Sequence, residues 1–304
     1  MKSILKKGRI LLDTLLDNEK YTGYLLILPN FIIFVVFFIY PFVSVWVYSL
    51  TEWDLFSTPV FVGFSNYISA IFTDSLFLKV LWNTIYYSFV AVLSAVFVAF
   101  WLALLMNRKI RGRIFLRLVY FFPYVSLYAA AAMVWTWLYH PDAGLFNYLL
   151  NLVGIKKINW LTDEFWAMPA IIIMANWKGI GYPILIFLAA FQEIPNELYE
   201  VSRIDGASWW HQIVHIAFPL TTPAIFFAIT TSLIGAFQLF DPFYIMTRGG
   251  PAYATTTMSY YIYQNGFEWF KMGYASTLAC ILFTFILIVT FIQWRLRKRW
   301  VYEG

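Results

Sequence analysis

Long apolar runs alternate with shorter polar stretches along this chain. Six of these runs lie at residues 24–48, 84–106, 118–139, 165–191, 217–240 and 273–294. Each is long enough to cross a bilayer as a helix, which takes about 20 apolar residues. The runs show no strand-like alternation of period two, and backbone groups in lipid must be satisfied within the protein. The pattern therefore predicts an all-α membrane protein with six transmembrane helices.

Composition supports this class. The chain has 304 residues, of which 62% are hydrophobic and only 12% are charged, whereas a soluble domain carries about 25% charged residues. Residues 24–299 are expected to form one six-span membrane domain, which leaves no room for a separate soluble domain. The first run has no charge for about 25 residues, too long for the apolar core of a cleaved signal peptide. Cys280 is the only cysteine, which excludes an intramolecular disulfide and a thiolate metal cluster.

The charge distribution predicts an orientation. The basic residues gather in the N-terminal tail, the loop after the second run, the segment 192–216 and the C-terminal tail, which together hold fifteen of the 21 Lys and Arg residues. Basic residues beside apolar spans mark the cytoplasmic side, so both termini and the segment 192–216 are predicted to be cytoplasmic. This clustering also argues against nucleic acid as the partner behind the net charge of +5. Leucines on one face of the tail 1–23 predict an interfacial helix, with a partly ordered tail as the alternative. Residues 300–304 form a short C-terminal tail.

The segment 192–219 is longer and more charged than a turn between two spans needs to be. Pro195 suits the start of a helix, and Glu197 and Glu200 then fall near its positive end. Gly206 permits a sharp turn, and Ser208 suits the start of a second helix. The segment therefore predicts a helix, a glycine break and a second helix.

This segment resembles the EAA loop of the membrane subunits of binding-protein-dependent ABC importers. Glu200, Gly206, Ile216 and Pro219 fall in register with that motif, while Val201, Ser202 and Phe218 depart from it. Short patches from the first run to the last resemble the carbohydrate-uptake branch, of the maltose and glycerol-phosphate permease type. They include Tyr40-Pro41, Asn159-Trp160-Leu161, Phe237 to Asp241 and Thr247 to Pro251.

The resemblance implies a type I ABC importer transmembrane domain in a bacterial or archaeal cytoplasmic membrane. It implies a second, similar permease subunit, two copies of an ABC ATPase, an extracytoplasmic solute-binding protein and a carbohydrate substrate. ATP and Mg²⁺ would bind the ATPase, so this chain is expected to bind no cofactor and no metal, and not to be an enzyme. The residues that the resemblance assigns to ATPase coupling are Glu197, Glu200, Asp205, Gly206, Ala207 and Trp210.

Lys178 is the one charged residue inside the six runs. A charge at membrane depth costs about 2.5–3.5 kcal/mol on insertion scales and marks a functional site by default. Aromatic faces stack on sugar rings, and amides or carboxylates bond to hydroxyls. Together with the resemblance, this gives as candidate substrate residues Trp177, Lys178, Gly179, Tyr182, Phe237, Gln238 and Asp241. Alternatives remain open: Trp177 and Phe237 as packing residues, Lys178 reaching the outer interface or pairing with Asp241, and a partner permease holding most substrate contacts.

Other functions fit the sequence less well. No phosphate-binding loop of the form G-x-x-x-x-G-K-[ST] occurs, so ATP hydrolysis requires a partner. A stand-alone secondary transporter usually carries acids within its spans for ion coupling, and a channel subunit would not need the pattern from Glu200 to Pro219. An integral membrane enzyme would need converging catalytic groups, yet His211 and His215 lack the H-E-x-x-H arrangement. The sequence does not name the sugar: Lys178 favours an anionic one, whereas the branch favours neutral oligosaccharides.

Overall fold

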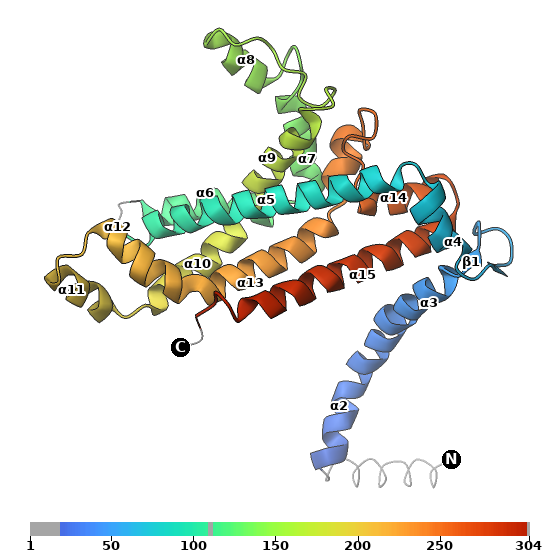
Figure 1. Cartoon of the computed structure of the whole chain (residues 1–304), viewed down its shortest axis with the longest axis horizontal. Coiled ribbons are helices and arrows are strands. Elements are labelled where there is room, and N and C mark those ends of the chain that lie inside the picture. Colours follow the sequence, from blue (N-terminus) through green and yellow to red (C-terminus); the bar gives the residue numbers. More distant parts are fainter. Residues whose placement is uncertain (1–18, 109–111, 303–304) are drawn as a thin grey trace, which may run out of the picture.

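The structure is a computed structural model that describes residues 19–108 and 112–302. The interfacial helix expected for the tail 1–23 falls largely outside these residues. Within them the chain is mostly helical (Figure 1). The elements, including five short π-helical turns labelled η, are α2 Glu19–Phe34, η1 Val35–Ile39, α3 Tyr40–Tyr48, β1 Thr51–Glu52, β2 Val60–Phe61, α4 Ser65–Ile68, η2 Ser69–Thr73, α5 Phe77–Met106, α6 Arg113–Val125, α7 Tyr128–Leu138, α8 Leu145–Leu152, α9 Ala167–Gly179, α10 Gly181–Glu193, α11 Asn196–Ile204, α12 Trp209–Gln212, η3 Ile213–Ala217, α13 Phe218–Phe237, η4 Phe243–Thr247, α14 Met258–Tyr263, η5 Gln264–Glu268 and α15 Met272–Arg297.

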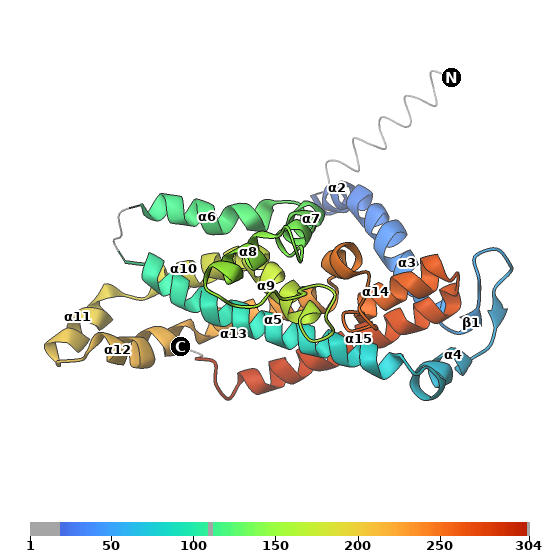
Figure 2. The same ribbon diagram turned by 90° about the horizontal axis from the view of Figure 1, so that it is seen from above.

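A bundle of long helices forms the body of the molecule. Helices α5, α10, α13 and α15 lie side by side in both views (Figures 1 and 2). Their facing side chains form the larger apolar core, in which Phe187, Leu233 and Leu278 are fully buried. A second core packs α7 and α9 against η4, around Ile171 and Phe243. Since lipid is as apolar as these side chains, close packing rather than water exclusion holds such helices together.

The first span leans away from the bundle. It runs unbroken through α2, η1 and α3, and it meets α15 near its own C-terminal end, where Phe42 and Trp46 pack edge-on against Phe283. Most of its apolar side chains are exposed. In a membrane they need a cover of lipid or of another protein chain.

Two of the predicted spans are bent rather than straight. The run 118–139 forms α6 and α7, which meet at 109°, and the run 165–191 forms α9 and α10, which meet at 46°. Pro123 removes a backbone donor near the end of α6, and Ser126 and Leu127 then adopt extended conformations. The described residues thus contain four helices long and apolar enough to cross a membrane, or six spans if each bent pair counts as one.

The boundaries of the remaining spans also shift. Helix α5 begins at Phe77, earlier than the predicted residue 84. The fifth span is continuous from Trp209 to Phe237, so the second helix of the polar segment and the span are one unit. The sequence analysis placed a boundary at residue 217 because charged and polar residues recur along the segment before it.

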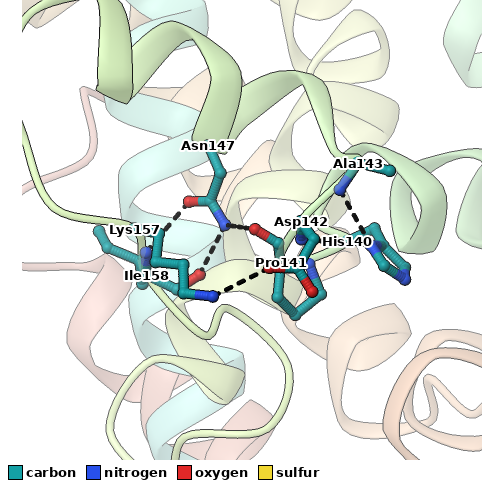
Figure 3. Close-up of polar contacts among 7 residues, drawn as sticks. All are labelled: His140, Pro141, Asp142, Ala143, Asn147, Lys157 and Ile158. Atoms are coloured by element: carbon teal, nitrogen blue, oxygen red, sulfur yellow. Dashed lines mark hydrogen bonds and ion pairs between the residues drawn. The ribbon is translucent and has the colours of Figure 1, made fainter.

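The bend after α6 carries α7, α8 and α9 out of the bundle (Figure 1). The turns around α8 are tied by the buried side chain of Asn147, whose Nδ2 donates to the carbonyls of Pro141 and Ile158, both at 2.9 Å (Figure 3). Lys157 forms an exposed ion pair with Asp142 at 2.9 Å, and its hydrogen bond and charge lower the pKa of that carboxyl. Such exposed ion pairs contribute little to stability, so the hydrogen bonds of Asn147 are what hold the turns around α8.

We expect Gly181→Ala to destabilise the protein. An added Cβ would lie 2.4 Å from the carbonyl oxygen of Tyr120, where α10 crosses α6. Overpacking of this kind costs about 1–3 kcal/mol, so the thermal unfolding midpoint of the solubilised protein should fall. Gly235→Ala in α13 is the control, because its Cβ would meet nothing within 4 Å. Equal midpoints for the two variants would contradict the close crossing.

Candidate functional site

The polar segment forms the helix, glycine break and helix that its sequence predicts. Helix α11 ends at Ile204, and Gly206 has a φ of +81°, which only glycine adopts without strain. The hydroxyl of Ser208 accepts a hydrogen bond from the backbone N–H of His211 at 3.3 Å and caps α12. Pro219 lies at the first turn of α13. The two views place α11 and α12 at one end of the bundle and β1 and α4 at the other (Figures 1 and 2).

Gln212 ties the two short helices together. Its Nε2 donates to the carbonyl of Tyr199 at 3.1 Å and to the hydroxyl of Ser202 at 2.8 Å. The side chain is buried, although most of its neighbours are exposed. The sequence analysis missed Gln212, because a single glutamine in a polar segment carries no signal until the fold brings α11 beside it.

Helix α11 presents an uncovered face of mixed character. Leu198, Val201 and Ile204 are exposed, and Ile204 is 86% exposed. These residues recur every three positions and therefore lie on one side of the helix. The predicted coupling residues Glu197 and Glu200 are exposed on the same short helix. Asp205 and Gly206 at the turn are exposed too, and Ala207 is half-buried.

Aromatic contacts fasten the start of the fifth span to the end of α5. The ring of Trp210 stacks on that of Trp101 with centroids 5.8 Å apart and planes 4° from parallel. The guanidinium of Arg108 lies 4.7 Å from the centre of the Trp209 ring. Trp210, predicted as a coupling residue, is thus 57% exposed while one face contacts α5.

The ammonium of Lys178 binds backbone carbonyls at the C-terminal end of α6. Its Nζ donates to the carbonyls of Ser126 at 2.9 Å, Tyr124 at 3.2 Å and Pro123 at 3.3 Å, and it lies 4.8 Å from the centre of the Tyr128 ring. An ammonium has three donors, and the three carbonyls match them. Carbonyls at a helix end also carry partial negative charge that favours a cation. In this arrangement Lys178 has no donor left for a substrate.

Trp177 lies differently from its neighbour. It is 44% exposed, and its ring centroid is 5.4 Å from that of Trp135. It lines a cavity of about 270 Å³ between α5, α6 and α9. Beside it, Nδ2 of Asn176 donates to the hydroxyl of Ser94 at 2.8 Å. Asn176 and Ser94 are polar groups within spans that the sequence analysis did not select.

The other substrate candidates divide between packing and surface. Phe237 is 1% exposed, packed edge-on against Phe89 and Phe285, so it contacts no ligand unless the helices rearrange. Tyr182 stacks on Tyr124 with centroids 5.7 Å apart. Gly179 is half-buried, and an added Cβ there would meet open space.

Gln238 and Asp241 follow the end of α13. Gln238 is exposed and Asp241 is half-buried. Asp241 lies within electrostatic reach of Lys178 and Tyr128, although the described residues show no ion pair between Asp241 and Lys178 within 4 Å. The ends of α13 and α9 and the start of α7 therefore converge, and Trp177, Gln238 and Asp241 are the candidates whose side chains remain accessible there.

Comparison with known proteins gives a consistent result. The family model described as "binding-protein-dependent transport system inner membrane component" matches residues 95–302. The sulfoquinovosyl glycerol transport system permease protein SmoG of Agrobacterium fabrum is 33% identical over 92% of this chain and 91% of its own length. The sn-glycerol-3-phosphate transport system permease protein UgpA of Salmonella choleraesuis is 34% identical over 91% of this chain and 94% of its own.

A solved structure shares the fold. A chain of a bacterial alginate ABC transporter, in complex with an alginate pentasaccharide-bound periplasmic protein, superposes with a TM-score of 0.82. It covers 93% of this chain and 96% of its own length, at 22% sequence identity. The expected type I importer fold is therefore confirmed.

We expect Lys178→Met to lower the thermal unfolding midpoint in the absence of any substrate. The substitution removes the ammonium donor from the carbonyls of Tyr124 and Ser126, while that of Pro123 still accepts from Ser126. A buried unsatisfied polar group costs about 1–3 kcal/mol. Lys178→Arg should retain much of the stability because it keeps donors and charge. Lys157→Met removes a surface ion pair and serves as the control. An unchanged midpoint for Lys178→Met would show that the ammonium does not hold the bend.

We expect Trp177→Ala to lower carbohydrate uptake while complex assembly stays intact. The ring is half exposed beside a cavity, so its removal should cost substrate contact more than packing. Uptake in proteoliposomes and co-purification of the subunits measure the two effects separately. Trp82→Ala is the control, because Trp82 is 65% exposed on α5 and does not line this cavity. Undiminished uptake would remove Trp177 from the substrate site.

Proposed function

The chain belongs to the family of binding-protein-dependent transport system inner membrane components, and we propose that it forms one half of the membrane pathway of an ATP-driven carbohydrate importer. Relatives that match nearly its whole length are permeases for sulfoquinovosyl glycerol and for sn-glycerol-3-phosphate. A second permease subunit would form the other half of the pathway. An extracytoplasmic binding protein would deliver the solute.

The observation that carries this proposal is the exposed face of α11. A helix that leaves Leu198, Val201 and Ile204 uncovered beside two glutamates is suited to a groove on another protein. In a helix-in-groove contact the apolar side chains supply most of the affinity. We assign this groove to an ABC ATPase, two copies of which would hydrolyse ATP bound with Mg²⁺. This chain itself would hydrolyse nothing.

The orientation follows from the same assignment. An ATPase requires α11 on the cytoplasmic side, where the basic residues also place it. The C-terminal tail supports this sidedness, since the N–H of Tyr302 donates to the hydroxyl of Thr222 at 2.9 Å near the start of α13. Both termini would then lie in the cytoplasm.

The mechanism follows from the continuity of the fifth span. Closure of the ATPase pair would displace α11, and Gln212 would pass the displacement to α12 through its bonds to Tyr199 and Ser202. Because the helix runs unbroken from Trp209 to Phe237, movement at the cytoplasmic end reaches Gln238 and Asp241. Packed helices shift between discrete arrangements, which would alternate access between the two sides.

We expect Gly206→Leu to release the ATPase while retaining the second permease. A leucine with a φ near +81° is strained, so the turn that presents α11 should change. A tagged pull-down from native membranes in mild detergent measures this. Gly154→Leu is a matched control, because Gly154 also has a positive φ, of +75°, in open space, but belongs to the loop after α8. If the unmodified chain brings down no ATPase, the importer assignment fails and a stand-alone transporter or channel subunit takes its place.

A further inference from the structure

A second cavity lies at the end of the bundle opposite α11. It has a volume of about 720 Å³ and is enclosed by the β1–β2 hairpin, α4, η2, η5 and the start of α15. Small-molecule sites have volumes of about 300–1,000 Å³. None of the candidate substrate residues from the sequence analysis lines it, so this cavity is separate from the region around Trp177.

The walls of the cavity are aromatic side chains held in fixed positions. The indole of Trp53 packs against Tyr48 with centroids 4.5 Å apart, and its Nε1 donates to the carbonyl of Ser57 at 3.0 Å. Trp269 packs edge-on against Tyr261 at 5.9 Å, while 40% of its surface stays exposed. Rigid aromatic faces offer contact area at little entropic cost.

Polar side chains that line the cavity are also held in place. The carboxylate of Asp74 accepts hydrogen bonds from the hydroxyls of Tyr261 and Tyr274 through Oδ2. Nδ2 of Asn66 donates to the carbonyls of Ser49 and Thr51, at 3.1 and 2.9 Å, which leaves its Oδ1 as an acceptor. The site is therefore built before any ligand arrives.

At the rim, Asp54 adds a further acceptor. Its Oδ1 accepts from the hydroxyl and N–H of Ser57, at 2.6 and 2.8 Å, and from the N–H of Phe56 at 3.0 Å. These bonds, that of the Ser57 hydroxyl first, lower the pKa of Asp54. Oδ2 of Asp54 is not used by these contacts and is available to a hydroxyl donor.

The backbone around the cavity is strained in two places. Leu55 has a φ of +73° and Phe270 a φ of +54°, which are uncommon for large side chains. The ring of Phe56, next to Leu55, packs against that of Phe270 with centroids 5.3 Å apart, so the two strained turns support each other. Strain of this kind persists where the surrounding structure over-determines it, and it gathers at ligand-binding positions.

The charge of the lining discriminates between ligands. Glu52, Asp54 and Asp74 line the cavity, against Lys271 as its one basic residue. An excess of carboxylates repels an anionic ligand. No group of three or more His, Cys, Asp or Glu in the described chain is placed to hold a metal ion, which argues against a cation site. Aromatic faces with carboxylate and amide acceptors match a ligand with apolar ring faces and many hydroxyl donors.

We infer that this outer cavity is a binding site for an uncharged saccharide, separate from the membrane spans. The inference rests on the proposed function, because the importer orientation places the cavity on the side from which solute arrives. It also assigns to this chain a sugar without charge, unlike the phosphate or sulfonate solutes that its relatives' names specify.

The test starts from the complete importer complex in lipid nanodiscs, without binding protein or nucleotide. Equilibrium dialysis with a panel of uncharged di- and trisaccharides and with trigalacturonate measures direct binding. We expect an uncharged sugar to bind and trigalacturonate not to bind. Trp269→Ala should weaken binding about tenfold, and Trp269→Phe should retain most of it. Phe72→Ala is the control, since Phe72 is 81% exposed on η2 and does not line the cavity.

Uptake with the binding protein, measured in parallel, separates this inference from the proposed function. A complex that imports a sugar but binds none of the panel directly overturns the inference and leaves the function standing. Binding of trigalacturonate in preference to the uncharged sugars overturns it as well. So does sugar binding that Trp177→Ala abolishes and Trp269→Ala does not. If Trp269→Ala weakens only the affinity of the complex for the binding protein, the cavity is a docking site for that protein rather than a saccharide site. A complex that imports no carbohydrate refutes the proposed function, and direct binding still decides the inference.

Discussion

The architecture depends on how one broken helix satisfies its backbone inside the membrane. Helix α6 ends at Val125, so the carbonyls of its last turn lack the donors that a following turn would supply, apart from those of Ser126. Water is not available to these carbonyls at membrane depth. The ammonium of Lys178 donates to them instead. This contact allows the 109° bend, which carries α7, α8 and α9 out of the bundle. An unpaired ammonium and unpaired carbonyls would each be costly in lipid, and the contact between them offsets both costs.

The bend also decides which candidate residues can meet a substrate. Consecutive residues on a helix point about 100° apart, so fixing Lys178 against α6 turns Trp177 toward the cavity beside α5. The residue singled out by its charge therefore serves the fold in this arrangement, while its uncharged neighbour remains accessible. Asp241 then stands near Lys178 without a direct ion pair, and its carboxylate stays available at the end of the fifth span.

Periodicity and composition predicted the parts of the fold that depend on local physics. The apolar runs, the glycine turn at Gly206 and the Ser208 cap were all readable, because each follows from the residue itself. The bend at Ser126 was not readable: Pro123 within an apolar run is compatible with a kinked single span, and the compensating group lies more than fifty residues later. Gln212 and the outer cavity were missed for the same reason, since their partners come from distant segments.

The fifth span connects these features mechanically. It extends from the Ser208 cap to Phe237 as one helix of 29 residues, about 44 Å at 1.5 Å per residue. A continuous helix transmits an axial displacement from one end to the other, whereas a loop between α12 and the span would absorb it. The stack of Trp210 on Trp101 and the contact of Arg108 with Trp209 attach the same end to α5. Under the proposed coupling, displacement of α11 would thereby be shared between α5 and α13, and the bundle would respond as a body rather than bend at one joint.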